Sequence, residues 1–291
     1  MLKGTAATAA GLTVASKASK TFAAPAVIQS GPTKIVYWGS FADSLGVAEK
    51  QLCDNFNAAQ TDVELEYQYQ GTYEETAQKL TAAVAARQTP DVSLVSDVWW
   101  FKFYLNNVLA PLNDLIAANN IDTTDYVDSL FNEGVRNGES YWIPMARSTP
   151  LFYFNKELYT EVGLPDGPET WDDLVAVTDQ LVTKDGDTIT RSAFAHPNSA
   201  SYVAWLFQPV VWQNLGAYSD ADFNIQINQE GAVKAGNFYR DSVVNGWATT
   251  PDDPESDFVN GYTASLMAST GSLAGILAES PFEVGTAFLP Q

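Results

Sequence analysis

Aromatic rings occur together with hydroxyl or carboxylate groups at the ends of three predicted strands. The three segments are Trp38-Gly39-Ser40, Gly71-Thr72-Tyr73 and Ser96-Asp97-Val98-Trp99-Trp100. Flat aromatic faces stack on sugar rings and other C–H surfaces, while carboxylates and hydroxyls hydrogen-bond with ligand hydroxyls. A core role is the simpler interpretation of any one of these aromatic residues, so the prediction depends on their joint placement. Their joint placement predicts a binding site for a small polar solute, with Trp38, Ser40, Tyr73, Asp97 and Trp99 as ligand-binding residues.

The sequence offers few groups for catalysis or metal binding. Cys53 is the one cysteine and His196 the one histidine, so neither an internal disulfide nor a Cys/His zinc cluster can form. Cys53 lies in a helical pattern and is interpreted as a core residue, whereas His196 lies in a polar stretch and is interpreted as a loop residue. We therefore expect no cofactor, no metal and no catalytic residues.

Two other classes of protein stay open as alternatives. The 35 Asp and Glu residues leave room for a glycosidase carboxylate pair, although no acid pair stands in a recognisable motif. A secreted carbohydrate-active enzyme is thus the main alternative to binding without chemistry. A structural or adhesive surface protein is less favoured, because the sequence contains no repeats of solenoid period and no stalk-like segments.

The elements that would position these groups alternate between strand and helix. Strand patterns at 34–38, 63–69 and 90–95 are separated by a helical pattern after Asp43 and a second helix at the capping box Thr72-x-x-Glu75. Such alternation predicts βαβ units and a mostly parallel sheet, whose ligands bind beyond the carboxyl ends of the strands. Apolar residues of the first helix recur at spacings of three and four, at Leu45, Ala48, Leu52 and Phe56.

A change of pattern near residue 140 predicts a second lobe. Strand-like runs at 140–144 and 151–155 are joined by residues 145–150, and a capped helix opens at Thr170-Trp171-Asp172-Asp173. We place the first crossing between lobes within residues 140–155. The predicted fold is α/β with two lobes, 30–147 and 148–284.

Residues 1–26 have the pattern of a secretory signal peptide. They contain three lysines, no acidic residue, a mildly apolar middle and an A-x-A exit site at Ala24-Pro25-Ala26. The first residues, Met1-Leu2-Lys3-Gly4, and the small residues after them resemble the second half of a twin-arginine signal. The arginine pair itself is absent, which is expected if the start of the sequence is truncated or misassigned. A disordered Ala-rich tail is the alternative. We expect an exported protein, periplasmic or extracellular.

The charge balance excludes several kinds of partner. With 15 Lys and Arg against 35 Asp and Glu, the formal net charge is −20, whereas nucleic acids and anionic membranes require a basic surface. The sequence contains no run of 18 or more apolar residues, so we predict no membrane-spanning helix. We expect no nucleic acid, no membrane insertion and a monomer.

Three short motifs are specific when they occur together. They are Ser148-Thr149-Pro150 running on to Tyr153-Phe154-Asn155-Lys156, Asn260-Gly261, and Ser269-Thr270-Gly271-Ser272-Leu273. With these motifs, nearly all of residues 33–291 resembles the family 1 extracellular solute-binding proteins of ABC importers, especially their glycerol-3-phosphate-binding and sugar-binding members. The resemblance implies a type II periplasmic-binding-protein fold with a ligand in the cleft between two lobes. It also implies the permease subunits of an importer as partners.

The resemblance also assigns ligand-binding roles to particular positions. Tyr73, Asp97 and Ser148 fall where the glycerol-3-phosphate binders use a tyrosine, an acid and a serine. The pair Ser269-Thr270 matches a Ser-Ser pair, and Trp212 falls near a tryptophan of the far lobe. Trp99 and Trp100 depart from that pattern and favour stacking on a sugar.

The resemblance predicts a chain longer than this one. Family members continue for well over a hundred residues beyond the position of Gln291. Residues 285–291 resemble the hinge strand that returns to the first lobe, so we expect the C-terminal part to be missing. We also expect a chain ending at this point to bind ligand poorly.

Overall fold

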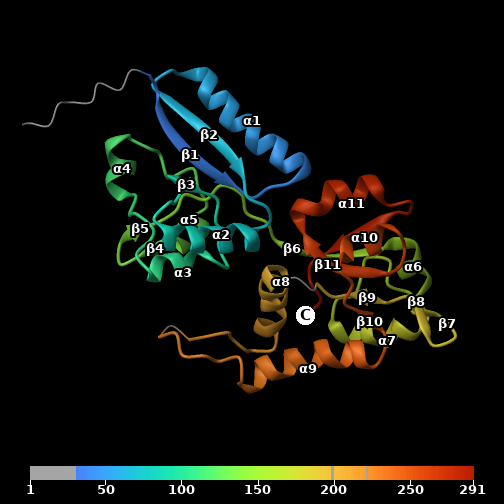
Figure 1. Ribbon diagram of the computed structural model, residues 1–291. Helices are drawn as coiled ribbons and strands as arrows, with labels where there is room; N and C mark the ends of the chain where they lie inside the picture. Colours follow the sequence, from blue (N-terminus) through green and yellow to red (C-terminus); the bar gives the residue numbers. More distant parts are fainter. Residues whose placement is uncertain (1–30, 198–199, 221) are drawn as a thin grey trace, which may run out of the picture.

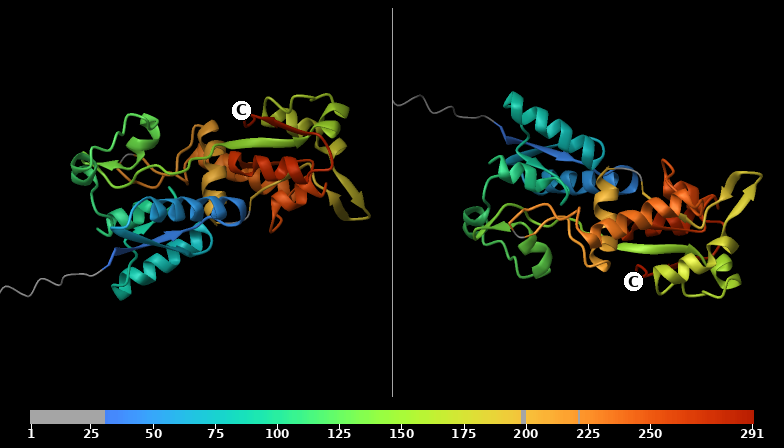
Figure 2. Two further views of the ribbon diagram at one scale, coloured as in Figure 1. Left: turned by 90° about the horizontal axis from the view of Figure 1, so that it is seen from above. Right: turned by 90° about the horizontal axis from the view of Figure 1, so that it is seen from below.

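The computed structural model of the protein describes residues 31–197, 200–220 and 222–291. These residues form two α/β lobes, each built around its own sheet (Figures 1 and 2). Strand β6 (Pro150–Asn155) is the first strand of the second sheet along the chain. The expected signal peptide, 1–26, lies outside the described residues.

The first lobe contains a parallel three-stranded sheet. Its order is β2 (Val63–Tyr69), β1 (Thr33–Gly39) and β3 (Val92–Ser93), with Tyr37 opposite both Tyr67 and Val92. Helix α1 (Asp43–Ala59) connects β1 to β2, and α2 (Tyr73–Ala86) follows β2. The strands therefore end at one edge of the sheet, where the predicted ligand groups follow them, as expected for parallel βαβ units.

Helix α2 begins as the sequence predicts. The Thr72 side chain accepts a hydrogen bond from the backbone N–H of Glu75, and the Glu75 carboxylate accepts one from the N–H of Thr72. Ala77 and Leu80 of this helix form a small core with Phe103 of α3 (Trp100–Leu105). The first lobe is completed by α4 (Asn113–Ala118), α5 (Asp128–Glu133) and the hairpin of β4 (Val135–Arg136) and β5 (Glu139–Ser140).

Helix α1 packs on the sheet with a different face from its apolar stripe. Leu45, Leu52 and Phe56 are 52%, 60% and 44% exposed, whereas Glu49 and Cys53 are 2% and 5% exposed. Glu49 faces the sheet because its carboxylate accepts hydrogen bonds from tyrosine hydroxyls of β1 and β2. The core position predicted for Cys53 is confirmed.

The second lobe contains a mixed five-stranded sheet. Its order is β10 (Ala248–Thr249), β9 (Phe194–Ala195), β11 (Ser265–Ser269), β6 and β12 (Val284–Ala287). The first three strands are parallel, and β6 is antiparallel to both of its neighbours. The sheet buries three fully shielded rings, Phe152, Phe154 and Phe194, against α7 (Trp171–Leu181), which begins at the predicted capping box.

The remaining elements of the second lobe lie around this sheet (Figure 1). They are α6 (Lys156–Glu161), the hairpin of β7 (Thr183–Asp185) and β8 (Thr188–Arg191), α8 (Ala200–Gln213), α9 (Glu230–Val244), α10 (Pro254–Val259), the short 3₁₀ helix η1 (Thr270–Ser272) and α11 (Leu273–Glu279). Helix α8 lies nearest the first lobe and contacts α2 there.

Residues 285–291 do not return to the first lobe, contrary to the expectation. Strand β12 pairs antiparallel with β6 at the edge of the second sheet. Beyond it, Leu289 packs on the second-lobe core, and the Gln291 N–H donates to the Glu169 carbonyl at 2.9 Å. Strand pairing and apolar burial thus hold this segment on the second lobe.

His196 lies in the connection after β9, as interpreted, but its side chain is buried. The side chain directly follows β9, is 2% exposed and lies between aromatic rings, with the Tyr239 ring centroid 3.9 Å away. Its Nε2 lies 2.7 Å from Ser242 Oγ, while its Nδ1 has no hydrogen-bond partner among the described residues. Burial lowers the pKa of His196 to about 3.

Acid is expected to destabilise the protein through His196. The folded-state pKa lies below the unfolded value of 6.5, so the unfolded chain takes up the proton first. The stabilisation is complete above pH 6.5 and is lost as the pH falls toward 3; at pH 5 the loss is about 2 kcal/mol. Urea unfolding at pH 7 and pH 5 measures it. His196→Gln should show a smaller pH dependence than the parent, and equal dependence would contradict the assignment.

Candidate functional site

Tyr73 lies at the first position of α2, on the cleft side of the first lobe. Its ring meets the edge of Phe41 at a centroid distance of 6.1 Å. Burial, together with the nearby Tyr202 and Asp97, raises the pKa of Tyr73 to about 12. Tyr202 belongs to α8 of the second lobe. A first-lobe tyrosine, a first-lobe carboxylate and a second-lobe tyrosine therefore come together between the lobes.

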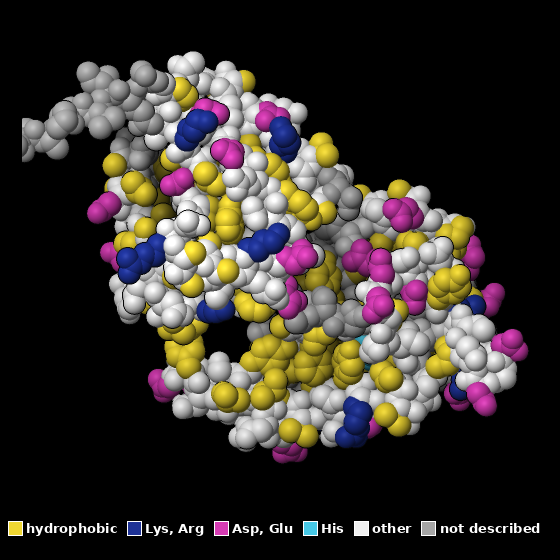
Figure 3. All heavy atoms as spheres, in the orientation of Figure 1, with side chains coloured by type: hydrophobic (Ala, Val, Ile, Leu, Met, Phe, Trp, Pro, Cys, Tyr) yellow, Lys and Arg dark blue, Asp and Glu magenta, His cyan; other side chains and the backbone are white. Residues whose placement is uncertain are grey.

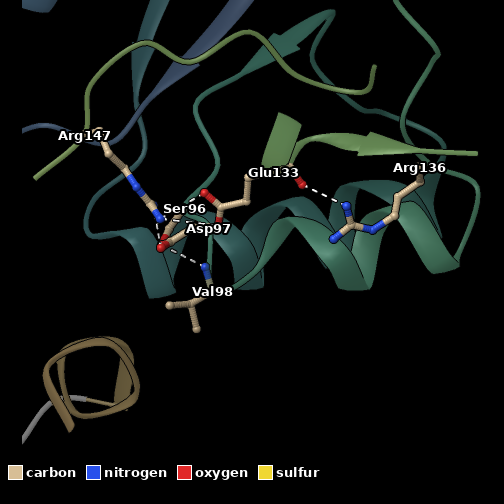
Figure 4. Close-up of polar contacts among 6 residues, drawn as sticks. All are labelled: Ser96, Asp97, Val98, Glu133, Arg136 and Arg147. Carbon is tan, nitrogen blue, oxygen red and sulfur yellow. Dashed lines mark hydrogen bonds and ion pairs between the residues drawn. The ribbon is translucent and has the colours of Figure 1, made fainter. Parts of the chain in front are cut away.

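The Asp97 carboxylate is held on both of its oxygens. Oδ1 accepts from Ser96 Oγ and from the Val98 N–H, each at 2.9 Å. Oδ2 lies 2.5 Å from Nη1 of Arg147, whose Nη2 lies 3.0 Å from Glu133 Oε2 (Figure 4). Burial raises the pKa of Glu133, and the positive charge of Arg147 opposes this shift.

The other first-lobe candidates have partners within the first lobe. Ser40 is 7% exposed, and its hydroxyl donates to Thr76 Oγ1 at 2.8 Å, within the first turn of α2. Trp38 donates from Nε1 to Gln68 at 3.0 Å, and both Trp38 and Trp99 pack against the small first-lobe core. A ligand role for these three residues stays a prediction.

A second group of candidates lies where the chain enters the second lobe. Ser269 ends β11, is 6% exposed, and accepts a hydrogen bond from the Gly271 N–H at 2.9 Å. Thr270 pairs with Thr149, whose N–H donates to Thr270 Oγ1 at 3.1 Å. The Ser148 hydroxyl lies beside Gly271, 3.5 Å from where a Cβ would be. Ser148, Ser269 and Thr270 are thus neighbours, and Ser148 directly follows the Arg147 that binds Asp97.

Trp212 is set apart from these groups. It is 56% exposed and lies at the end of α8 opposite to Tyr202. Its predicted ligand role stays a prediction.

Three further groups of the cleft were missed by the sequence analysis. Arg147 and Tyr202 have been described above, and the third is Glu255 of α10. The Glu255 carboxylate accepts from Ser272 Oγ at 2.7 Å, and burial raises its pKa. Burial and then the charge of Glu255 raise the pKa of Tyr202. Only Arg147 had a signal in the sequence, namely its position directly before Ser148.

The two lobes enclose an opening. Figure 3 shows it at the lower left of the visible face, with hydrophobic side chains beside it. Besides the contact of α8 with α2, the lobes also touch through two aromatic rings. Phe223, in the connection between α8 and α9, stacks on Phe101 of α3 with the ring centroids 5.0 Å apart and an angle of 22° between the ring planes. A separate groove of about 530 Å³ lies between α1 and β2 and includes none of the predicted ligand residues.

The described residues supply no evident metal site or membrane span. Among residues 31–197, 200–220 and 222–291, no group of three or more His, Cys, Asp or Glu side chains is placed to hold a metal ion. The helices within those ranges also lack the combination of length and hydrophobicity that a membrane crossing requires.

Two α/β lobes around a cleft of aromatic, hydroxyl and carboxylate groups define a two-lobed binding-protein fold of type II. The chain belongs to the bacterial extracellular solute-binding protein family, whose profile matches residues 14–291. Its relatives are therefore binding proteins of transporters.

Known relatives agree with this assignment. The sn-glycerol-3-phosphate-binding periplasmic protein UgpB of Pectobacterium atrosepticum is 28% identical over 277 residues, which cover 89% of this chain and 60% of the relative. The chain thus spans about 60% of the length of the curated relatives that it matches.

Solved structures share the architecture. UgpB from Mycobacterium tuberculosis in complex with glycerophosphocholine is 40% identical, with a TM-score of 0.79 over 90% of this chain and 68% of that one. The GacH receptor of Streptomyces glaucescens, solved unliganded and with acarbose, is 20% identical, with a TM-score of 0.75 over 89% of this chain and 67% of that one. The latter similarity supports the fold alone.

Proposed function

We propose that the protein is the substrate-binding component of an ABC importer and captures a small polar solute between its lobes. The observation that carries the proposal is the contact between α2, which begins at Tyr73, and α8 of the second lobe, which holds Tyr202. Asp97 lies close enough to act on the same tyrosine. Two-lobed binders close around one ligand, so groups from both lobes must face the same space. Family membership supports this role and the permease subunits as partners.

The proposed ligand is a hydroxyl-bearing solute of the sugar, polyol or glycerol-phosphate class. The relatives are named for sn-glycerol-3-phosphate, and the 40% identical structure holds glycerophosphocholine. Asp97 and Glu133 both bind Arg147, and Arg136 also acts on Glu133, so the charge of Arg147 is already paired within the first lobe. The Asp97 carboxylate offers a hydrogen-bond acceptor to a ligand that presents hydroxyls or a positive group here.

The remaining features of the proposal follow from the same role. The protein is exported, acts as a monomer and binds without chemistry. Catalysis has its own test, because incubation with candidate glycosides would release products from an enzyme and leave a binding protein's ligand intact.

A thermal-shift and calorimetry screen tests the proposed function. The probes are sn-glycerol-3-phosphate, glycerophosphocholine, ribitol and maltose, since a ligand at 100 times its Kd stabilises the folded state by about 2.7 kcal/mol. We expect one probe class to raise the melting temperature. If none binds and none raises it, the proposal fails.

Replacing Tyr73 with alanine is expected to weaken binding of the active probe by about tenfold, because one aromatic contact contributes about 0.5–1.5 kcal/mol. Calorimetry of the folded variant measures the change. Tyr262→Ala is the matched control, since Tyr262 is 59% exposed on the second lobe. Equal affinities of the two variants would remove Tyr73 from the site.

A further inference from the structure

The side chain of Arg147 joins parts of the first lobe that are far apart in the sequence. Its guanidinium lies between Asp97, in the connection from β3 to α3, and Glu133, at the end of α5 (Figure 4). The side chains of Arg147 and Asp97 are 34% and 20% exposed. Partial burial makes such a pair stronger than one at the open surface.

This ion-pair cluster also determines the direction of Asp97. The Ser96 hydroxyl and the Val98 N–H occupy one carboxylate oxygen, and Arg147 occupies the other. A carboxylate held from both sides has little rotational freedom left to lose when a ligand binds, so pre-ordering favours affinity.

Two residues beyond Arg147, the chain is already attached to the second lobe. The Thr149 N–H donates to Thr270 Oγ1 at 3.1 Å, and the Thr270 N–H donates to the Thr149 carbonyl at 3.0 Å. Pro150 then pairs with Ser269 in the second sheet.

The residues before this crossing are attached to the first lobe. The Tyr37 hydroxyl lies 3.5 Å from the sulfur of Met145, and the Arg147 side chain follows with its two carboxylates. Ser148 is therefore the one residue between an anchor on the first lobe and an anchor on the second. A change of lobe angle at this crossing has to be absorbed by the backbone dihedrals around Ser148.

We propose that Arg147 is a positioning residue: by binding Asp97 and Glu133 it orients the Asp97 carboxylate for the ligand and places the pivot of this crossing at Ser148. The ligand part rests on the proposed function, while the pivot part rests on the contacts of the crossing alone. Arg147 acts through Asp97, so its removal weakens binding without removing a direct ligand contact.

A double-mutant cycle tests the ligand part. Calorimetry uses whichever of sn-glycerol-3-phosphate, glycerophosphocholine, ribitol or maltose binds the parent. Arg147→Ala should weaken binding about tenfold, and Arg147→Lys should restore part of it, because an ammonium keeps the charge but not the two-pronged geometry. In an Asp97→Asn background, Arg147→Ala should have no further effect. Additive losses would show that Arg147 does not act through Asp97 and would overturn this part.

The pivot part is tested without ligand. Spin labels on cysteines at Ala82 of α2 and Lys234 of α9, with Cys53→Ala, report the distance between the lobes. Arg147→Ala should broaden the distance distribution, and Arg147→Lys should broaden it less. Lys184→Ala, in the exposed β7, is a control that should leave it unchanged. An unchanged distribution in Arg147→Ala overturns the pivot. Failure of every probe to bind would count against the proposed function alone, because the distance measurement still decides the pivot.

Discussion

Replacing Glu49 with alanine is expected to destabilise the protein by about 3 kcal/mol, because each buried hydroxyl left unpaired costs about 1–3 kcal/mol and a cavity adds to that. Glu49 is 2% exposed on the inner face of α1. Its Oε1 accepts from the Tyr37 hydroxyl at 2.5 Å, and its Oε2 accepts from the Tyr67 hydroxyl at 2.9 Å. The substitution removes both acceptors at once: the buried Tyr37 hydroxyl keeps only the Met145 sulfur at 3.5 Å, and the partly exposed Tyr67 loses its acceptor at the edge of the groove.

Two further variants on the same helix make the test specific. Glu49→Gln keeps one oxygen acceptor in nearly the same volume and should cost clearly less than alanine. Gln51→Ala changes an exposed side chain of α1 and should stay within about 0.5 kcal/mol of the parent. Urea unfolding at pH 7 gives all three values. Should Glu49→Ala unfold at the same urea concentration as Gln51→Ala, the two tyrosines must have found other acceptors, and the network has no role in stability.

The hydrogen bonds of Glu49 also show what hydrophobic periodicity does not predict. The spacing of Leu45, Ala48, Leu52 and Phe56 predicts helix α1 correctly, and the helix exists from Asp43 to Ala59. The pattern does not predict which face meets the sheet, because the carboxylate of Glu49 finds two hydroxyl donors there. Periodicity measures where apolar residues lie, whereas packing responds to polar pairs that come from other strands.

Local signals were the most dependable. The capping boxes at Thr72 and Thr170 are satisfied in the structure, since each depends on residues three apart in the chain. The strand at 90–95 is shorter than predicted, with only Val92–Ser93 paired, because its pairing depends on β1 rather than on its own composition. The placement of 285–291 failed for the same reason: a strand-like segment does not specify its partner.

Only the first-lobe part of the candidate site was predictable from the sequence. Tyr73 and Asp97 follow strands of one parallel sheet, and the rule for strand ends brings them to the same edge. Tyr202 reaches them from a helix of the other lobe, more than a hundred residues later, and no spacing in the sequence encodes that approach. The buried position of His196 was hidden likewise, because its polar neighbours in the chain are not its neighbours in space.

Asp97→Ala is expected to reduce affinity for the active probe by about a hundredfold, because a hydrogen bond to a charged group contributes about 1.5–3 kcal/mol. The expectation depends on the proposed function. Asp97 lies beside Tyr73 and is oriented by Ser96, Val98 and Arg147, so its loss removes both a ligand acceptor and the partner of Arg147. Calorimetry on the folded variant measures the change.

The controls for Asp97 separate ligand contact from stability. The Arg147 pair is partly exposed, so breaking it should change the free energy of unfolding by no more than about 1 kcal/mol. Glu133→Gln removes the other carboxylate bound to Arg147 but leaves Asp97 in place, and it should weaken binding far less than Asp97→Ala. If Glu133→Gln and Asp97→Ala weaken binding equally, the net charge of the cluster matters and the position of Asp97 does not. If neither variant changes the affinity of a well-folded protein, the ligand lies elsewhere in the cleft, because a carboxylate in contact with it could not be removed without loss.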